Sequence, residues 1–280
     1  MTTRALVLGG GGVAGIAWET GVLAGLADGG VDATGADLVI GTSAGSTVAA
    51  QITSHLSLED LFARQVDPAQ SSGELTAPSS LAGLEQFFVE AVAATSSVLE
   101  LRVAVGAMAL KTDTVPEQAR LAVIAGRLPR HVWPRRPMRI VAVDALTGEE
   151  RSFDEQGDVS LVDAVAASSA VPGVWPPVSI EGRRYIDGGF RSVLNADLAV
   201  GHDSVLILAP MDELLPVSEN VSAGMRRLED EARMQFIRPD EASITAFGPD
   251  LLDPAIRGAS ARAGRSQGQA VAASVQSLWE

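Results

Sequence analysis

The sequence of 280 residues contains no cysteine, only three histidines, and 21 lysines and arginines against 35 aspartates and glutamates. Without cysteine the chain has no disulfide, no thiolate metal site and no cysteine nucleophile. The histidines are far apart, at positions 55, 131 and 202, so we expect neither a metal site nor a cofactor. The net charge of −14 repels phosphate backbones and anionic headgroups. We therefore expect no nucleic-acid partner and at most transient contact with a membrane surface.

Long hydrophobic runs are also missing. No stretch approaches the roughly 18 uncharged apolar residues of a membrane-spanning helix, and Glu100 and Arg102 interrupt the longest candidate. The N-terminus passes from Arg4 through a short apolar segment into glycines, without the pattern of an export signal. We therefore expect a cytoplasmic protein. Because 46% of the residues are apolar, we expect it to fold, as one domain over residues 1–280.

Short apolar runs alternate with helical patterns along the chain, at five places that we predict to be strands. This alternation predicts an α/β fold with a mostly parallel central sheet and helices on both faces. A helical insertion is expected between the second and third strands, where it either covers one side of the sheet or closes an apolar pocket. The rest of the chain after the motif-bearing core is expected to pack peripherally. The ranges are 5–8, 37–40, 138–143, 183–186 and 204–208 for the strands, 4–210 for the core, 57–137 for the insertion and 211–280 for the peripheral segment.

A serine follows the second predicted strand in the pentapeptide Gly-Thr-Ser-Ala-Gly, which has the form G-x-S-x-G. A strand that passes directly into a helix must turn sharply, so Gly41 and Gly45 keep bulky side chains out of the turn. The turn raises the hydroxyl of Ser43 above the carboxyl edge of the sheet, where the N-terminus of the next helix favours negative charge. Ser43 is either a nucleophile, which we favour, or only the cap of that helix.

Gly10, Gly12 and Gly15 match the dinucleotide fingerprint G-x-G-x-x-G, which also follows a strand and opens a helix. That site needs an acidic residue at the carboxyl end of the second strand. Here the second strand leads into the turn of Ser43, and the acidic residue Asp37 stands at the beginning of that strand. The alternative is that the glycines expose backbone N–H groups beside Ser43, where a tetrahedral oxyanion would form. One site then accounts for both motifs.

No histidine is well placed to activate Ser43. His131 and His202 precede strands and therefore lie at the amino edge of a parallel sheet, whereas active sites of open α/β sheets lie at the carboxyl edge. His55 lies about 18 Å along the helix that follows the serine. A Ser-His-Asp triad is therefore not expected.

Two carboxylates stand at the carboxyl ends of predicted strands, Asp144 and Asp187. Gly188 and Gly189 follow Asp187 and let its backbone turn closely against another loop. Asp144 is followed by residues typical of a turn, so we expect it to cap that turn. Asp187 is therefore the better candidate for the base.

Four motifs in this order resemble the patatin-like phospholipase family. The resemblance covers about residues 4–210 and implies a three-layer α/β/α fold, hydrolysis of a lipid or lipid-like ester, and a Ser-Asp dyad without histidine. The motifs are GGGGVAG at 9–15, GTSAG at 41–45, SSAVPGVWPPV at 168–178 and DGG at 187–189.

The resemblance also implies a role for each residue of the site. Ser43 would be the nucleophile and Asp187 the general base. The amides of Gly10, Gly11 and Gly12 would form the oxyanion hole. The remaining motif glycines would support the loops, namely Gly15, Gly41, Gly45, Gly188 and Gly189.

The sequence departs from the family at Ala14, where the glycine loop usually carries arginine or lysine. Without a cation there, an anionic phosphate group near Ser43 would lose water with little compensating charge. We therefore expect a preference for neutral esters, unless an arginine around the Asp187 loop supplies the charge. The candidates are Arg183, Arg184 and Arg191.

The sequence thus predicts a serine acyl hydrolase that works through an acyl-enzyme. Two other classes remain open: a non-catalytic ligand-binding or regulatory module that keeps the fold, and a nucleotide-binding oxidoreductase. The presence of Ser43 and Asp187 weighs against the first, and the missing ribose carboxylate weighs against the second. Acyl chain length, headgroup and oligomeric state are not set by these patterns.

Overall fold

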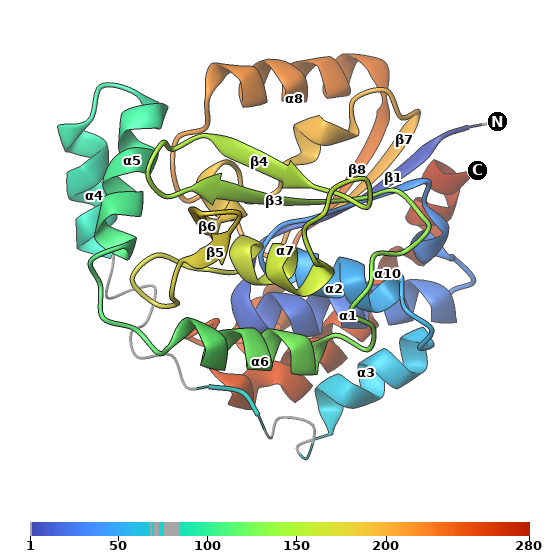
Figure 1. The fold of residues 1–280 in the computed structure, drawn as a ribbon. Helices are drawn as coiled ribbons and strands as arrows, with labels where there is room; N and C mark the ends of the chain where they lie inside the picture. Colours follow the sequence, from blue (N-terminus) through green and yellow to red (C-terminus); the bar gives the residue numbers. More distant parts are fainter. Residues whose placement is uncertain (1, 68, 70–72, 76–84) are drawn as a thin grey trace.

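The computed structural model describes residues 2–67, 69, 73–75 and 85–280 (Figure 1). Within them eight strands form one sheet, in which β5-β6-β3-β2-β1-β7-β8 are neighbours and β4 pairs with β3. The strands are β1 (Arg4–Leu8), β2 (Leu38–Gly41), β3 (Met138–Asp144), β4 (Glu150–Phe153), β5 (Val178–Ile180), β6 (Arg183–Asp187), β7 (Ser204–Leu208) and β8 (Arg233–Ile237).

The centre of the sheet is parallel, as expected. β3, β2, β1, β7 and β8 run in the same direction. β6 and β4 each pair antiparallel with β3, and β5 pairs antiparallel with β6. The sequence did not indicate β4, β5 or β8, because β4 buries only Phe153 and β8 only Ile237, so neither carries the continuous apolar run of a central strand.

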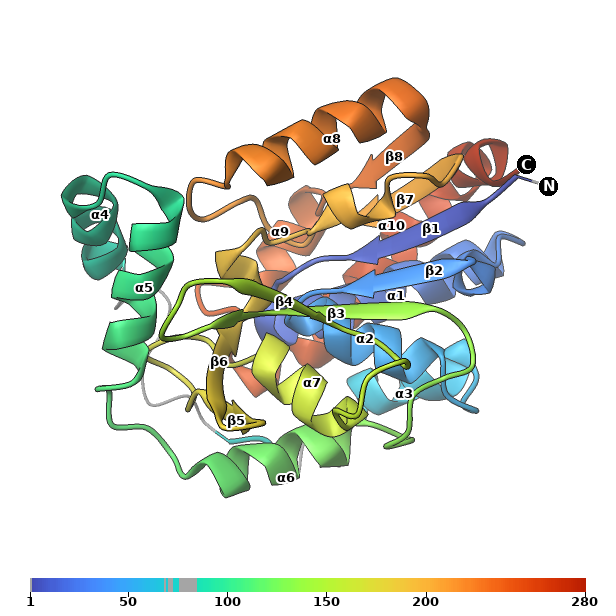
Figure 2. The same cartoon turned by 45° about the horizontal axis from the view of Figure 1, so that its top comes forward.

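Helices cover both faces of the sheet, which confirms the predicted three-layer fold (Figure 2). Leu6 and Leu8 of β1 pack into the core beneath α1, α2, α7 and α10, whereas Ala5 and Val7 face a second core that includes Leu228 of α8. The sheet is therefore buried on both sides. These helices are α1 (Gly12–Asp28), α2 (Ala44–Ile52), α7 (Leu161–Ser168), α8 (Glu219–Glu231) and α10 (Arg257–Trp279).

The region between β2 and β3 forms only helices in its described part, with no strand. α3 packs against α1 and α10, α4 packs against α5, and α6 packs against α7. α5 lies so close to the end of β3 that a Cβ atom on Gly106 would come within 2.0 Å of the carbonyl oxygen of Ala145. These helices are α3 (Leu58–Val66), α4 (Glu85–Ala94), α5 (Val98–Ala109) and α6 (Glu117–Arg127).

The segment 211–280 is not peripheral, contrary to our expectation. It adds β8 to the sheet (Figure 2) and packs α10 against α1. A Cβ atom on Gly21 of α1 would meet the carbonyl oxygen of Ala261 at 2.1 Å, and one on Gly264 of α10 would meet that of Trp18 at 2.4 Å. Glycines on both helices thus let the two backbones touch. Among the described residues, no helix is long and apolar enough to cross a lipid bilayer.

Candidate active site

Ser43 lies in the turn between β2 and α2 and adopts a φ of 52°, a conformation that strains a residue with a side chain. The turn is tight on both sides. A Cβ atom on Gly45 would come within 2.0 Å of the carbonyl oxygen of Leu8, and one on Gly41 within 2.6 Å of the Cα atom of Ser46. Only glycine fits at these two positions. A strained turn from a strand into a helix, with glycine on both sides of the serine, is the geometry of a nucleophile elbow.

The hydroxyl of Ser43 donates a hydrogen bond to Oδ2 of Asp187 over 2.7 Å. The backbone N–H of Gly189 donates to Oδ1 of the same carboxylate over 2.7 Å. Burial raises the pKa of Asp187 to about 7, although both hydrogen bonds and the charge of Arg120 act in the opposite direction. The carboxylate therefore has the geometry and the proton affinity of a general base working near neutral pH.

The register of the sheet explains how residues 144 positions apart meet. Gly41 of β2 pairs with Ile140 of β3, and Ala142, two residues further along β3, pairs with Asp187 of β6. Ser43 also lies two residues beyond Gly41, so it is level with Asp187. We expected Asp187 at the carboxyl edge of a parallel strand. Its strand, β6, is instead antiparallel to β3 and begins beyond the carboxyl edge of the parallel strands. Asp187, at the end of β6, therefore lies at that edge beside Ser43.

The last residue of α7 and the loop after it hold the backbone of the serine turn. Ser168 accepts a hydrogen bond from the N–H of Ser43 over 3.0 Å, and the hydroxyl of Ser169 donates to the carbonyl oxygen of Ser43 over 3.2 Å. The N–H of Asp187 donates to the carbonyl oxygen of Ala170 over 3.0 Å. Sequence reasoning assigned no role to these residues, although they belong to the third motif. That motif positions both members of the pair.

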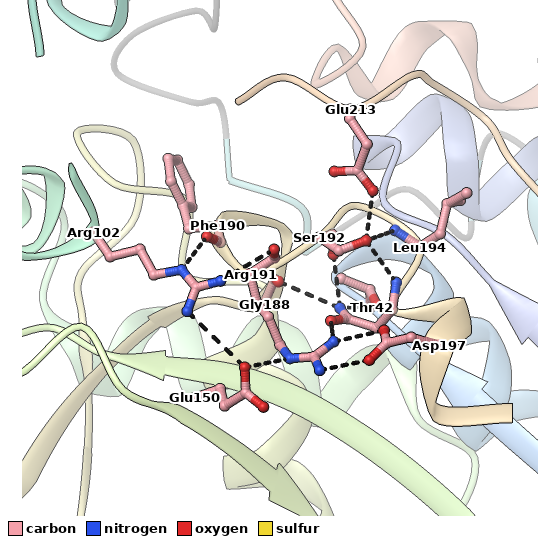
Figure 3. Close-up of polar contacts among 11 residues, drawn as sticks. Thr42, Arg102, Glu150, Gly188, Phe190, Arg191, Ser192, Leu194, Asp197 and Glu213 are labelled. Atoms are coloured by element: carbon pink, nitrogen blue, oxygen red, sulfur yellow. Dashed lines mark hydrogen bonds and ion pairs between the residues drawn. The ribbon is translucent and has the colours of Figure 1, made fainter. Parts of the chain in front are cut away.

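The loop after Asp187 is fixed by a network of charges (Figure 3). Arg191 bonds Glu150 of β4 over 2.6 Å and both carboxylate oxygens of Asp197 over 2.7–2.8 Å. Arg102 of α5 donates to the carbonyl oxygens of Phe190 and Arg191. Arg191 and Arg102 are both buried, so the helical region between β2 and β3 directly holds the base loop.

The glycine loop contains both hydrogen-bonded and free backbone amides. The N–H of Gly10, one of the expected oxyanion donors, donates to the carbonyl oxygen of Val193 over 2.9 Å, so it already has a partner in this structure. The amides of Gly11 and Gly12 donate to no group in the described part of the chain. They lie at the N-terminus of α1, where the helix dipole favours an anion.

Gly15 and Gly188 have packing roles. A Cβ atom on Gly15 would lie 3.2 Å from the Cβ atom of Ala44, so this glycine lets α1 approach the first turn of α2. A Cβ atom on Gly188 would lie 2.1 Å from the carbonyl oxygen of Val141 in β3. The close approach of the base loop to the sheet therefore requires glycine.

The histidines lie away from Ser43. His202 lines a cavity with Asp37 and Met138 at the amino edge of the sheet, and the ring of His131 bonds the carbonyl oxygen of Ala125 over 2.9 Å. Asp144 accepts hydrogen bonds from the N–H groups that follow it in its turn, as expected. No group of three or more potential metal ligands occurs in the described ranges.

One cavity adjoins Ser43, and a second, wider cavity lies next to it. The narrow one, about 20 Å³, is lined by Ser43, Gly12, Arg120 and Trp175 among others. The wide one, about 480 Å³, lies between α1 and α6. Four residues line both cavities, namely Val13, Ile16, Leu75 and Arg127. The wide cavity has the size of a small-molecule site, and the narrow one has room for about one water-sized group.

The arginines around Asp187 do not supply a charge to this pocket. Arg183 pairs with Asp144, Arg184 donates to the carbonyl oxygen of Pro177, and Arg191 is engaged in the loop network. Two arginines of α6, Arg120 and Arg127, line the narrow cavity together with Ser43 instead. The premise that a substrate anion meets no compensating charge is therefore wrong. No local pattern marks Arg120, because its place depends on how α6 packs against distant parts of the chain.

A family model described as patatin-like phospholipase matches residues 6–200. The chain belongs to the patatin-like phospholipase family. This membership supports lipid acyl hydrolysis as the general class of activity of this patatin-like chain. A comparison with curated proteins found no match.

Two crystal structures are similar to this patatin-like chain. One is VipD from Legionella pneumophila, with 12% identity, a TM-score of 0.47 and coverage of 98% of this chain and 67% of VipD. The other is the type III effector protein ExoU, with 14% identity, a TM-score of 0.40 and coverage of 98% of this chain and 53% of ExoU. The patatin-like chain thus spans about half the length of ExoU.

Proposed function

We propose that this protein is a serine acyl hydrolase that cleaves lipid carboxylic esters through a Ser43–Asp187 dyad. The observation that carries the proposal is the 2.7 Å hydrogen bond from the Ser43 hydroxyl to a buried carboxylate whose pKa is about 7. A buried base with that pKa is deprotonated in about half of the molecules at neutral pH and holds a proton readily once it has taken one.

In the acylation step, Asp187 takes the proton of Ser43 while the serine oxygen attacks the carbonyl carbon of the ester. The carbonyl oxygen becomes an oxyanion, and the free amides of Gly11 and Gly12 are its proposed donors. Protonated Asp187 then gives its proton to the departing alcohol, which leaves the acyl group on Ser43.

In the deacylation step, water enters where the alcohol left. Asp187 takes one proton from the water while the water oxygen attacks the acyl carbon. Collapse of the second oxyanion releases the carboxylic acid and returns the proton to Ser43, so the dyad is regenerated. No histidine takes part in either step.

The wide cavity supports a substrate larger than its ester group. Its lining includes the apolar side chains of Val13, Ile16 and Val123, which suit an acyl chain, and it adjoins the narrow cavity of Ser43. Lipid or lipid-like esters are therefore the proposed substrates, and a cytoplasmic location remains a prediction of the sequence. A non-catalytic binding module is the second candidate, because the same cavities would hold a ligand without chemistry.

The experiment is hydrolysis of a short-chain ester by wild type, Ser43→Ala, Asp187→Asn and His202→Ala. We expect no activity above background for Ser43→Ala, a loss in kcat of about 10³-fold or more for Asp187→Asn, and near wild-type activity for His202→Ala. Severe loss in a folded His202→Ala protein contradicts the dyad. Binding of a lipid ester without hydrolysis by wild type supports the second candidate.

A further inference from the structure

Glu213 lies in the segment that joins β7 to α8, outside the residues that the family model matches. The hydroxyl of Ser192 donates a hydrogen bond to Oε1 of its carboxylate (Figure 3). The N–H of Val193 donates to Oε2 over 2.8 Å. The two carboxylate oxygens of Glu213 thus hold two consecutive residues of the loop that follows Asp187. Neither step of the proposed reaction uses this carboxylate.

Val193 connects Glu213 to the glycine loop. The carbonyl oxygen of Val193 accepts a hydrogen bond from the N–H of Gly10 over 2.9 Å. A Cβ atom on Gly10 would lie 3.4 Å from Cγ1 of Val193 and 3.7 Å from the Cβ atom of Ser43. Gly10 is therefore close to both Val193 and the candidate nucleophile. The bond from Val193 to Glu213 thus helps to fix how far the glycine loop lies from Ser43.

Ser192 connects Glu213 to the turn of the nucleophile. The oxygen of its hydroxyl, which donates to Glu213, accepts a hydrogen bond from the N–H of Asn195 over 3.0 Å. The side-chain amide of Asn195 donates in turn to the hydroxyl of Thr42, the residue before Ser43. A continuous chain of hydrogen bonds therefore leads from Glu213 to the serine turn.

Pro210 supports the glycine loop from the same segment after β7. A Cβ atom on Gly11 would come within 2.5 Å of the Cβ atom of Pro210, and one on Gly15 within 3.4 Å. The segment therefore contacts the glycine loop directly through Pro210 and reaches it a second time through Glu213 and the residues that Glu213 holds.

We infer that Glu213 is a positioning residue that sets the place of the oxyanion donors relative to Ser43. The inference rests on the proposed function, in which the amides of Gly11 and Gly12 donate to the oxyanion. Such donors stabilise the transition state only when they point at the place where the charge develops, so a small displacement is costly. Glu213 is exposed and does not line either cavity in the described part of the chain, so it acts through the residues that it holds.

The test measures kcat and KM of wild type, Glu213→Ala and Glu213→Gln for p-nitrophenyl butyrate. We expect Glu213→Ala to lower kcat by about 30-fold and to change KM by less than about 3-fold, because misplaced oxyanion donors weaken the transition state and not substrate binding. Glu213→Gln should lower kcat by only about 5-fold, because its amide oxygen can still accept from the N–H of Val193.

Asp212→Ala is the matched control, because it removes the neighbouring carboxylate of the same segment, which is 91% exposed and pairs with Arg238. It should leave kcat and KM unchanged. Circular dichroism establishes that each variant is folded. Wild-type kcat in Glu213→Ala overturns the inference, and so does an equal loss in Asp212→Ala. If Glu213→Ala does not fold, the isosteric Glu213→Gln decides, and an unchanged kcat in that variant overturns the inference.

Amide hydrogen exchange separates this inference from the proposed function, because it requires no reaction. The exchange rate of the Gly10 amide is measured by NMR in wild type, Glu213→Ala and Asp212→Ala. We expect about 10-fold faster exchange in Glu213→Ala alone, since the segment that bonds Gly10 is then held less firmly. Unchanged exchange overturns the link from Glu213 to the glycine loop. If wild type cleaves no ester, the proposed function fails, and faster exchange in Glu213→Ala alone still supports the link.

Discussion

The side-chain amide of Asn195 donates a hydrogen bond to the hydroxyl of Thr42 over 2.9 Å. Thr42 immediately precedes the candidate nucleophile. The same amide donates to the carbonyl oxygens of Gly188 and Ser192, in the loop that follows the candidate base. One buried side chain thus joins the turn of Ser43 to the loop of Asp187.

This link predicts that Asn195 positions the dyad without touching the substrate. We expect Asn195→Ala to lower kcat by about 10- to 100-fold with little change in KM, because small displacements of a nucleophile from its base are costly. Thr42→Val removes the other end of the bond. In a double-mutant cycle the losses should be clearly less than additive. Fully additive losses would mean that the bond does not couple the two loops.

The pKa of Asp187 predicts the pH dependence of activity. A general base must be deprotonated, so kcat/KM should rise with pH through about 7. The charge of Arg120 lowers this pKa, and Arg120→Gln should therefore move the acid limb to higher pH. The measurement is a pH profile of kcat/KM for a neutral ester, with Arg183→Gln as control. An acid limb that stays in place in Arg120→Gln contradicts the electrostatic coupling of Arg120 to Asp187.

The same carboxyl group predicts the pH dependence of stability. In the unfolded chain Asp187 loses its proton near 3.8, and in the folded protein only near 7. Its contribution to stability is therefore fully present below about 3.8 and is lost as pH rises through 7. Asp187→Asn cannot ionise, so its melting temperature should exceed that of wild type at about pH 8 and match it at about pH 4. A lower melting temperature at both pH values would show that the carboxylate stabilises the fold.

The sequence predicted the central strands well and the edge of the sheet poorly. β1, β2 and β7 are buried on every residue or nearly so, and continuous apolar runs make such strands visible. The direction of β6 was not foreseen. It is set by a two-residue turn at Glu181 and Gly182, both with positive φ, which joins β5 and β6 as a hairpin. Since β5 has only three residues, no periodic pattern announces that hairpin.

The candidate site was predictable where local geometry decides it. The turn of Ser43 and the loop of Asp187 need glycine for close approach, and those glycines are visible in the sequence. Arg120 and the engaged amide of Gly10 were not predictable, because each depends on a contact with a distant segment. For this reason, the absence of a cation at Ala14 did not imply the absence of a positive charge in the pocket.

The central claim is that Asp187 activates Ser43 as a covalent nucleophile, and a fluorophosphonate tests it most directly. The modified residue is identified by mass spectrometry of peptides from the labelled protein. We predict one adduct, on Ser43, that is absent from Ser43→Ala and forms at least about 10²-fold more slowly in Asp187→Asn. A folded wild-type protein that gains no adduct, gains it on another serine, or reacts equally fast without the Asp187 carboxylate contradicts the claim.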